Sequence, residues 1–162
     1  MHEQILTDRQ RIFGDDDPDT LTSRNNLAGA YESAGRLDQA VTLYEQNLTD
    51  CERVLGNDHP DTLTSRNNLA YAYQAAGRLD QAITLYEQNL TDCERVLAKD
   101  HPDTLTSRNN LAYAYRAAGR LDQAITLYEQ TLTDRQRVLG DDHPDTLTSR
   151  NNLEAARRTK DV

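Results

Sequence analysis

The sequence predicts an all-α fold, an α-solenoid of antiparallel helix pairs, and two observations carry this prediction. The motif Pro-Asp-Thr-Leu-Thr-Ser-Arg-Asn-Asn-Leu begins at Pro18, Pro60, Pro102 and Pro144, and this constant spacing of 42 residues is typical of a repeat array. Within each period, apolar residues recur every three or four positions, as on one face of an α-helix. Stacked units bury only the faces between neighbours, which agrees with an apolar content of 36%.

The period divides residues 1–162 into a single array with incomplete units at both ends. Residues 1–17 are a partial second helix. Complete repeats occupy residues 18–59, 60–101 and 102–143, and residues 144–162 form a first helix that caps the C-terminal end. We therefore do not treat the chain as one ordinary mixed globular domain.

The leading residues 2–14 resemble residues 128–140, so the chain opens with the back half of a second helix. This half-helix lacks its first-helix partner. Its apolar residues Ile5, Ile12 and Phe13 are less obviously capped than the C-terminal end.

Each complete repeat encodes two helices, as the middle unit shows. Pro60 suits the first position of a helix, Asp61 favours the positive N-terminus, and Gly77 ends the helix in the left-handed conformation. A short turn through Arg78 leads into a second helix that runs to Val96 and Leu97, antiparallel to the first. The apolar face of the first helix is Leu63, Leu69, Ala70, Tyr73 and Ala76, and that of the second is Ala82, Leu85, Tyr86, Leu90, Cys93, Val96 and Leu97.

The trailing segment begins as a first helix and then becomes polar. Glu154 and Arg157 replace the core-type Ala70 and Tyr73 of the middle unit. A polar outer face is typical of a terminal capping repeat.

The repeat resembles the tetratricopeptide repeats, in particular the 42-residue kind found in kinesin light chains and many bacterial proteins. Leu69, Ala70 and Tyr73 match the L-G-x₂-Y part of the family pattern, and Ala82 with Tyr86 matches A-x₃-F. Arg66 replaces the family's Trp and Glu94 its Pro, so the second helix continues for about two more turns. The resemblance implies a right-handed superhelix whose first helices line the inner, concave wall.

Composition excludes several classes of partner. The formal net charge of −9 disfavours nucleic acid, which is bound by Lys and Arg, and equally disfavours an anionic membrane surface. The N-terminus lacks the apolar core of a signal peptide, so we expect a cytoplasmic protein in which Cys51 and Cys93 are reduced thiols.

No catalytic or metal site is indicated, so we expect a protein that is not an enzyme and needs no cofactor. His59, His101 and His143 are 42 residues apart and so fall on loops of successive repeats. Such loops should be about 10 Å or more apart, too far to share one ion, so we interpret these histidines as parts of helix starts. Asn47 and Asn89 match the glycosylation sequon but lie inside predicted helices, which favours coincidence.

The candidate binding residues are polar positions that recur on the first helices. In the resembling family, an asparagine before the Leu of the first helix often faces the groove and binds the backbone of an extended peptide, as an amide with donors and an acceptor can. By that match the first set is Asn26, Asn68, Asn110 and Asn152, together with the neighbouring Asn25, Asn67 and Asn109.

Further along the same helices, Tyr71 and Tyr113 would supply flat amphipathic contact area. One turn on, the residue changes from Glu32 through Gln74 to Arg116, which would alter the charge of the wall from unit to unit. The alternative is that these exposed positions drift and bind nothing.

Two other positions carry structural predictions. The arginines in the family's Trp position should reach solvent or an aspartate such as Asp80, with their stems packed on the core. They are Arg24, Arg66, Arg108 and Arg150. Because Arg135 replaces Cys51 and Cys93 in the third unit, that position should lie at the edge of the apolar stripe.

Two functions follow from these features. The first is a protein–protein interaction scaffold that binds an extended peptide or a partner protein in the concave groove. The alternative is head-to-tail self-association through the incomplete terminal repeats, giving filaments or rings.

Overall fold

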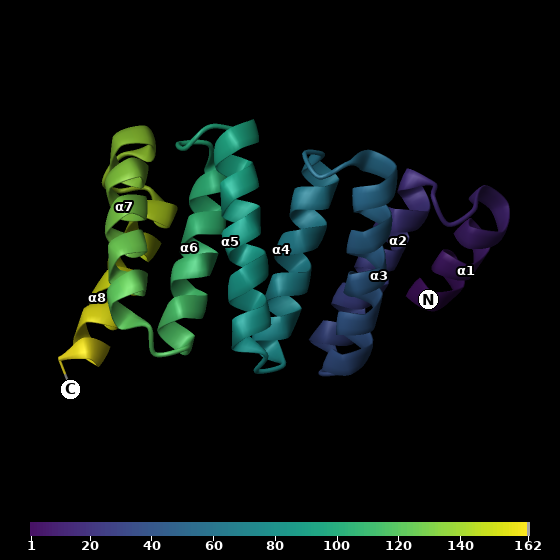
Figure 1. Ribbon diagram of the computed structural model, residues 1–162, viewed down its shortest axis with the longest axis horizontal. Helices are drawn as coiled ribbons and strands as arrows, with labels where there is room; N and C mark the ends of the chain where they lie inside the picture. Colours follow the sequence, from purple (N-terminus) through teal and green to yellow (C-terminus); the bar gives the residue numbers. More distant parts are fainter. Residues whose placement is uncertain (162) are drawn as a thin grey trace. The chain divides into compact units, whose positions relative to one another are not determined.

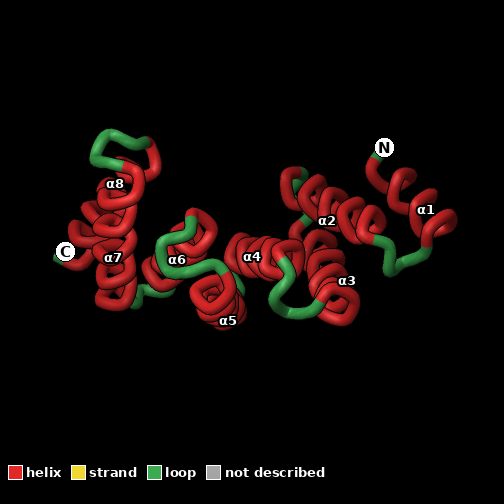
Figure 2. Tube along the Cα trace, turned by 90° about the horizontal axis from the view of Figure 1, so that it is seen from above, coloured by secondary structure: helices red, strands yellow, loops and turns green. Residues whose placement is uncertain are grey.

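The computed structural model describes residues 1–161, which fold into eight α-helices with short connections (Figure 1). The helices are α1 (His2–Phe13), α2 (Pro18–Ser33), α3 (Leu37–Leu55), α4 (Pro60–Ala75), α5 (Leu79–Val96), α6 (Pro102–Ala117), α7 (Leu121–Leu139) and α8 (Pro144–Lys160). Figure 2 shows helix and loop with no strand in the described part of the chain. The all-α prediction and the helix order are confirmed, and consecutive helices pack as antiparallel pairs.

The chain forms two compact units, which we describe separately. Unit 1 is Met1–Ala82 and contains α1 to α4 with the first turn of α5; unit 2 is Ile83–Val162 and contains the rest of α5 with α6 to α8. Val162 lies outside the described residues.

The first helix α4 begins and ends on signals that the sequence carries. His59 is the N-cap of α4, and its Nδ1 accepts a hydrogen bond of 3.2 Å from the main-chain N–H of Asp61. At the other end Gly77 has φ 75°, its N–H donates to Gln74, and the next N–H, of Arg78, donates to the main-chain oxygen of Tyr73. This is the Schellman arrangement, in which a left-handed glycine lets the chain turn back. The histidine at the helix start therefore has a structural role.

The core of unit 1 lies between the facing stripes of α2, α3 and α4. Small buried alanines such as Ala28 and Ala40 allow the helices to approach closely, and Leu21, Val41 and Leu48 fill the space between them. The same positions are occupied by equivalent residues in unit 2, where Ala112, Ala124 and Leu105 are buried. The apolar spacing read from the sequence thus marks the packing faces, except at Val96, which is 38% exposed.

No helix of residues 1–161 is both long enough and apolar enough to cross a membrane.

Candidate functional site

The repeated asparagines of the first helices hydrogen-bond to one another. In unit 1, Asn68 of α4 donates an amide hydrogen to Oδ1 of Asn25 in α2 over 3.0 Å. In unit 2, Asn152 of α8 makes the same bond to Asn109 of α6 over 3.2 Å. The bonds link consecutive first helices, which the sequence did not predict. Because an amide nitrogen carries two hydrogens, each bond leaves the donor a second hydrogen for another partner.

The remaining predicted residues lie along the same helices. Asn26 is exposed, and Asn67 and Asn110 are half-buried. One helical turn further on, the rings of Tyr71 and Tyr113 are 50% and 43% exposed. Large aromatic side chains that remain this open, next to amides, are the kind of group found in binding surfaces.

The variable position of the first helices lies beside a buried tyrosine hydroxyl. In unit 1, Glu32 accepts a hydrogen bond of 3.4 Å from Tyr44, and burial raises the pKa of both groups, that of Tyr44 to about 12. Gln74 in the second repeat is half-buried, and its Oε1 has no hydrogen-bond partner among residues 1–161. In unit 2, the Arg116 guanidinium lies 5.3 Å from the centre of the Tyr113 ring, a cation–π contact. The charged residues at this position, Glu32 and Arg116, therefore each interact with a tyrosine of their own unit.

Three arginines in the family's Trp position, Arg24, Arg66 and Arg108, form buried ion pairs, whereas Arg150 is half-buried. Arg24 is 5% exposed, and its guanidinium lies 2.5 Å from the Asp50 carboxylate on the following second helix. Arg108 is 4% exposed and contacts Asp134 at 2.7 Å and Glu94 at 3.1 Å. The expectation that a carboxylate compensates this charge is confirmed.

The particular partner suggested by the sequence needs correction. The aspartates equivalent to Asp80 in the other repeats are Asp38 and Asp122, and they lie near Arg78 at 3.4 Å and Lys160 at 2.5 Å. The buried arginines instead reach residues near the middle and end of the second helices, because their side chains run along the interface and away from the turn.

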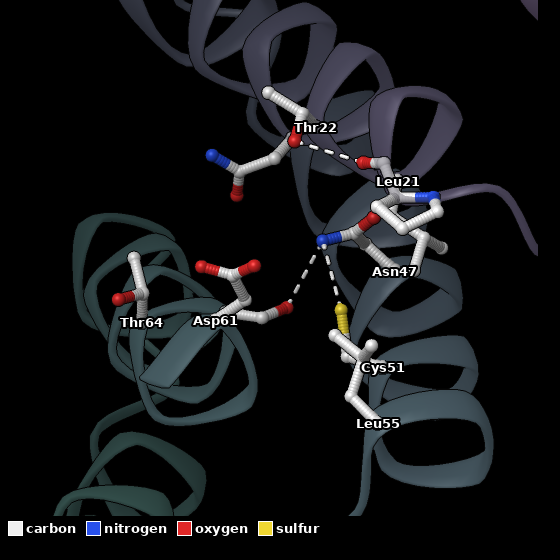
Figure 3. Close-up of a pocket in the computed structure, with 10 residues that line it drawn as sticks. Leu21, Thr22, Asn47, Cys51, Leu55, Asp61 and Thr64 are labelled. Atoms are coloured by element: carbon white, nitrogen blue, oxygen red, sulfur yellow. Dashed lines mark hydrogen bonds between the residues drawn. The ribbon is translucent and has the colours of Figure 1, made fainter. Parts of the chain in front are cut away.

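A cavity of about 130 Å³ lies in unit 1 where α2, α3 and α4 meet (Figure 3). Its polar lining comprises Thr22 and Asn25 of α2, Asn47 and Cys51 of α3, and Asp61, Thr64 and Ser65 of α4. Asn25 is also a member of the predicted binding set, so the cavity adjoins the asparagine face.

Asn47 is the buried polar group of this cavity. Only 3% of it is exposed, and its amide donates to Ser65 Oγ at 3.2 Å and contacts Cys51 Sγ at 3.8 Å, as the dashed lines in Figure 3 show. Its Oδ1 is buried without a hydrogen-bond partner in residues 1–161. This burial agrees with the interpretation of the sequon at Asn47 as coincidence. It also leaves an unmet acceptor, which is costly.

The prediction that Arg135 lies at the edge of the apolar stripe is wrong. Arg135 is 6% exposed, and Cys51 and Cys93 at the same position are both 2% exposed. Arg135 is tolerated because its guanidinium donates to Ser149 Oγ at 2.9 Å and to the main-chain oxygen of Asp145 at 3.0 Å. Burial lowers the pKa of this guanidinium.

The histidines at the helix starts belong to no metal-binding cluster in the described part of the chain. In residues 1–161 there is no group of three or more His, Cys, Asp or Glu side chains with the placement of a metal site. His101 and His143 cap α6 and α8 as His59 caps α4.

Comparison with known families gives one match. The sequence model described as Tetratricopeptide repeat matches residues 1–49, 27–88, 66–136 and 109–161, and these overlapping ranges cover residues 1–161. No curated protein shows significant similarity to the chain.

Solved structures share the fold. The nearly identical TPR-like repeats of a candidate kinesin light chain from Podosopora anserina are 33% identical, with a TM-score of 0.87 over 98% of this chain and 75% of that one. BtubC (BKLC) from P. vanneervenii is 25% identical, with a TM-score of 0.85 over 97% of this chain and 63% of that one. The first TPR of Spaghetti (RPAP3), solved bound to the HSP90 peptide SRMEEVD, is 15% identical, with a TM-score of 0.63 over 90% and 97%.

Proposed function

The chain belongs to the tetratricopeptide repeat family, and we propose that it is a non-catalytic scaffold that binds an extended peptide or partner protein on the face of its first helices. Proteins of this family are generally non-catalytic scaffolds. The structure of RPAP3 holds a peptide on this fold, and at 15% identity that likeness concerns the fold alone.

The observation that carries the proposal is the asparagine face with its open tyrosines. Asn68 uses one amide hydrogen in its bond to Asn25, so a second hydrogen can reach a peptide carbonyl. Tyr71 and Tyr113 offer rigid apolar area with a polar tip on the same helices. Backbone contacts from amides, with aromatic contacts beside them, suit a ligand bound in extended form. We expect a cytoplasmic partner, because thiols such as those of Cys51 and Cys93 stay reduced in that compartment.

A peptide selected from a random library against the wild-type chain tests this proposal. We expect the double variant Asn68→Ala, Asn110→Ala to bind the selected peptide about tenfold more weakly in fluorescence anisotropy, which corresponds to about 1.4 kcal/mol for two lost hydrogen bonds. The pair Tyr71→Ala, Tyr113→Ala should weaken binding at least as much, and it spares the bond between Asn68 and Asn25. Gln88→Ala, an exposed position of α5, is the matched control. Unchanged affinity in both double variants would contradict the proposal.

Self-association is the second candidate, and exposed apolar residues at the two terminal helices favour it. Ile12 and Phe13 of α1 are 61% and 59% exposed, and Leu147 of α8 is 41% exposed although its equivalent Leu105 is 1% exposed. Glu154 and Arg157 are exposed on α8 and weaken the case. Light scattering over a hundredfold range of concentration decides this question. A mass that rises with concentration, and that falls back in Leu147→Glu, supports assembly, whereas a constant monomer mass excludes it.

A further inference from the structure

We infer that the cavity between α2, α3 and α4 is a pocket for a guanidinium group, supplied by an arginine side chain of the bound peptide. The inference deepens the proposed function and rests on it for the source of the group. It names a chemistry that the asparagine face alone does not specify.

The chain itself places a guanidinium group against the equivalent wall of another repeat. Asp61 and Ser65 of the cavity correspond, two periods later, to Asp145 and Ser149 at the junction of α7 and α8. There Arg135, from the position of Cys51, donates to Ser149 Oγ at 2.9 Å and to the Asp145 main-chain oxygen at 3.0 Å. The α4 wall that faces the cavity is thus built like a wall that holds a guanidinium group in unit 2.

A second junction repeats one of these two bonds, at an arginine that is 35% exposed. Arg9 of α1 occupies the same repeat position one period before Cys51, and it donates to the main-chain oxygen of Asp19 at 2.7 Å. Asp19 is the equivalent of Asp61. Where the chain has a cysteine instead of an arginine, the space for the guanidinium group is left to an outside group.

The cavity also supplies acceptors that a guanidinium group needs. Oδ1 of Asn47 is buried without a partner in residues 1–161, and the amide projects from α3 into the space between α2 and α4 (Figure 3). The carboxylate of Asp61 is 67% exposed. A cavity of about 130 Å³ holds roughly four waters at liquid density, which is enough for a guanidinium head. Planar donors on one cation can satisfy several acceptors at once.

The junctions are of two kinds, which differ at two positions together. In the cysteine form these positions hold Asn47 and Cys51 or Asn89 and Cys93, and in the arginine form they hold Thr131 and Arg135. Asn47 accompanies Cys51 and donates to Ser65, whereas Thr131 accompanies Arg135, which makes the equivalent bond itself. In unit 2 the cysteine form recurs: Asn89 is 3% exposed, donates to Ser107 at 3.3 Å and has an Oδ1 without a partner in the described residues. The cysteine form therefore leaves an acceptor unmet each time, and the arginine form does not have that asparagine.

The test uses blocked single amino acids as probes, so that it does not depend on the rest of a peptide. N-acetyl-arginine methylamide is titrated into the ¹⁵N-labelled chain, with the citrulline and lysine analogues as comparisons. We expect saturable shifts of the Asn47 side-chain amide and the Ser65 main-chain amide with the arginine probe, and binding about tenfold weaker with each analogue. The variant Asn47→Thr, Cys51→Arg, Asn89→Thr, Cys93→Arg, which copies the third repeat at both junctions, should bind none of them.

The control Gln46→Ala, at an exposed position of α3 that does not line the cavity, should bind the arginine probe as wild type does. Absence of saturable shifts, equal binding of citrulline or lysine, or arginine binding that persists in the arginine-form variant would each overturn the inference. If the arginine probe does not bind but substitutions at Asn68 and Tyr71 still weaken binding of the selected peptide, this inference fails and the proposed function stands. A melting curve for each variant confirms that a lost signal does not arise from unfolding.

Discussion

Four buried tyrosine hydroxyls give the chain a predictable response to alkaline pH. Burial, with a nearby glutamate in three cases, raises the pKa from 10.0 to about 12 for Tyr44, Tyr73, Tyr115 and Tyr128. In the unfolded chain these groups ionise near their ordinary value, so the unfolded state loses protons first as pH rises. The stabilisation is complete below about pH 10 and is lost between about pH 10 and 12. Urea unfolding across this range should show a steep fall in the free energy of unfolding.

Two substitutions distinguish the effect of buried tyrosine hydroxyls on stability at alkaline pH from a general loss of stability at high pH. Tyr73→Phe removes a hydroxyl that donates to Glu45 at 2.7 Å, so it should cost about 1 kcal/mol at neutral pH and make the alkaline fall less steep. Tyr71→Phe changes a ring that is 50% exposed and should leave the profile as it is. A profile that is flat in wild type, or equal in the two variants, would contradict this account.

The buried arginines differ in energy according to their surroundings. Arg108 is 4% exposed between Asp134 and Glu94, so Arg108→Met leaves two partly buried carboxylates without their cation and should cost about 2 to 3 kcal/mol. Arg150 is half-buried and lies 3.4 Å from an exposed Asp141, so Arg150→Met should cost about 0.5 kcal/mol. Urea midpoints of the two variants measure the difference. Equal losses would show that the ion pairs of Arg108 contribute no more than a surface pair.

At the scale of the element, the loop after each second helix contains a residue with a positive φ, where a side chain causes backbone strain. Ala98 has φ 82°, whereas Gly56 and Gly140 hold φ 87° and 90° at the same repeat position. An alanine side chain is unfavourable in that region, so Ala98→Gly should stabilise the chain by about 1 kcal/mol. Gly56→Ala is the reverse exchange in the preceding repeat and should destabilise by a similar amount. Thermal unfolding of both checks the signs, and two changes of the same sign would contradict the argument.

The helices could be predicted from the sequence because their signals are local. Pro60 and Gly77 bound α4 as expected, and the lack of a proline at Glu94 accounts for the length of α5. Burial of a charge could not be predicted in the same way, since it depends on groups from the next helix. From the sequence, Arg135 is predicted to lie at an edge because it replaces two cysteines, whereas its buried partner Ser149 comes from the next helix. The available signal was the joint change of two residues four positions apart, Asn89 to Thr131 with Cys93 to Arg135.

For the whole chain, repetition explains how far the site could be predicted. The asparagine positions can be singled out as candidates because they recur in every unit, and Asn68 and Asn152 are half-buried on first helices. Their bonds to Asn25 and Asn109 were missed because they join residues 43 apart, in different repeats. The cavity was missed for the same reason, since its walls come from α2, α3 and α4. A repeat period shows which positions are equivalent, but it does not show which residues of different repeats are in contact.

A chain of helices that pack on their neighbours should not open uniformly. In α1 the one buried residue is Leu6, whereas α3 buries Ala40, Val41, Tyr44, Asn47, Leu48 and Cys51. Repeat arrays have stability that is a sum over units and their interfaces, so α1 should open locally at a lower free energy than α3. Native-state hydrogen exchange should show amides of α1 exchanging at least about tenfold faster, equivalent to about 1.4 kcal/mol.

Two variants in α1 test the cause of that difference. Leu6→Ala removes its buried contact and should abolish the protection of α1 without changing exchange in α3, while Ile12→Ala, at a side chain that is 61% exposed, should change neither. If Leu6→Ala instead lowered protection in α1 and α3 equally, unit 1 would unfold as one cooperative block. The interface between α1 and α2 would then be as strong as the interface between α2 and α3, even though α1 has only one buried residue.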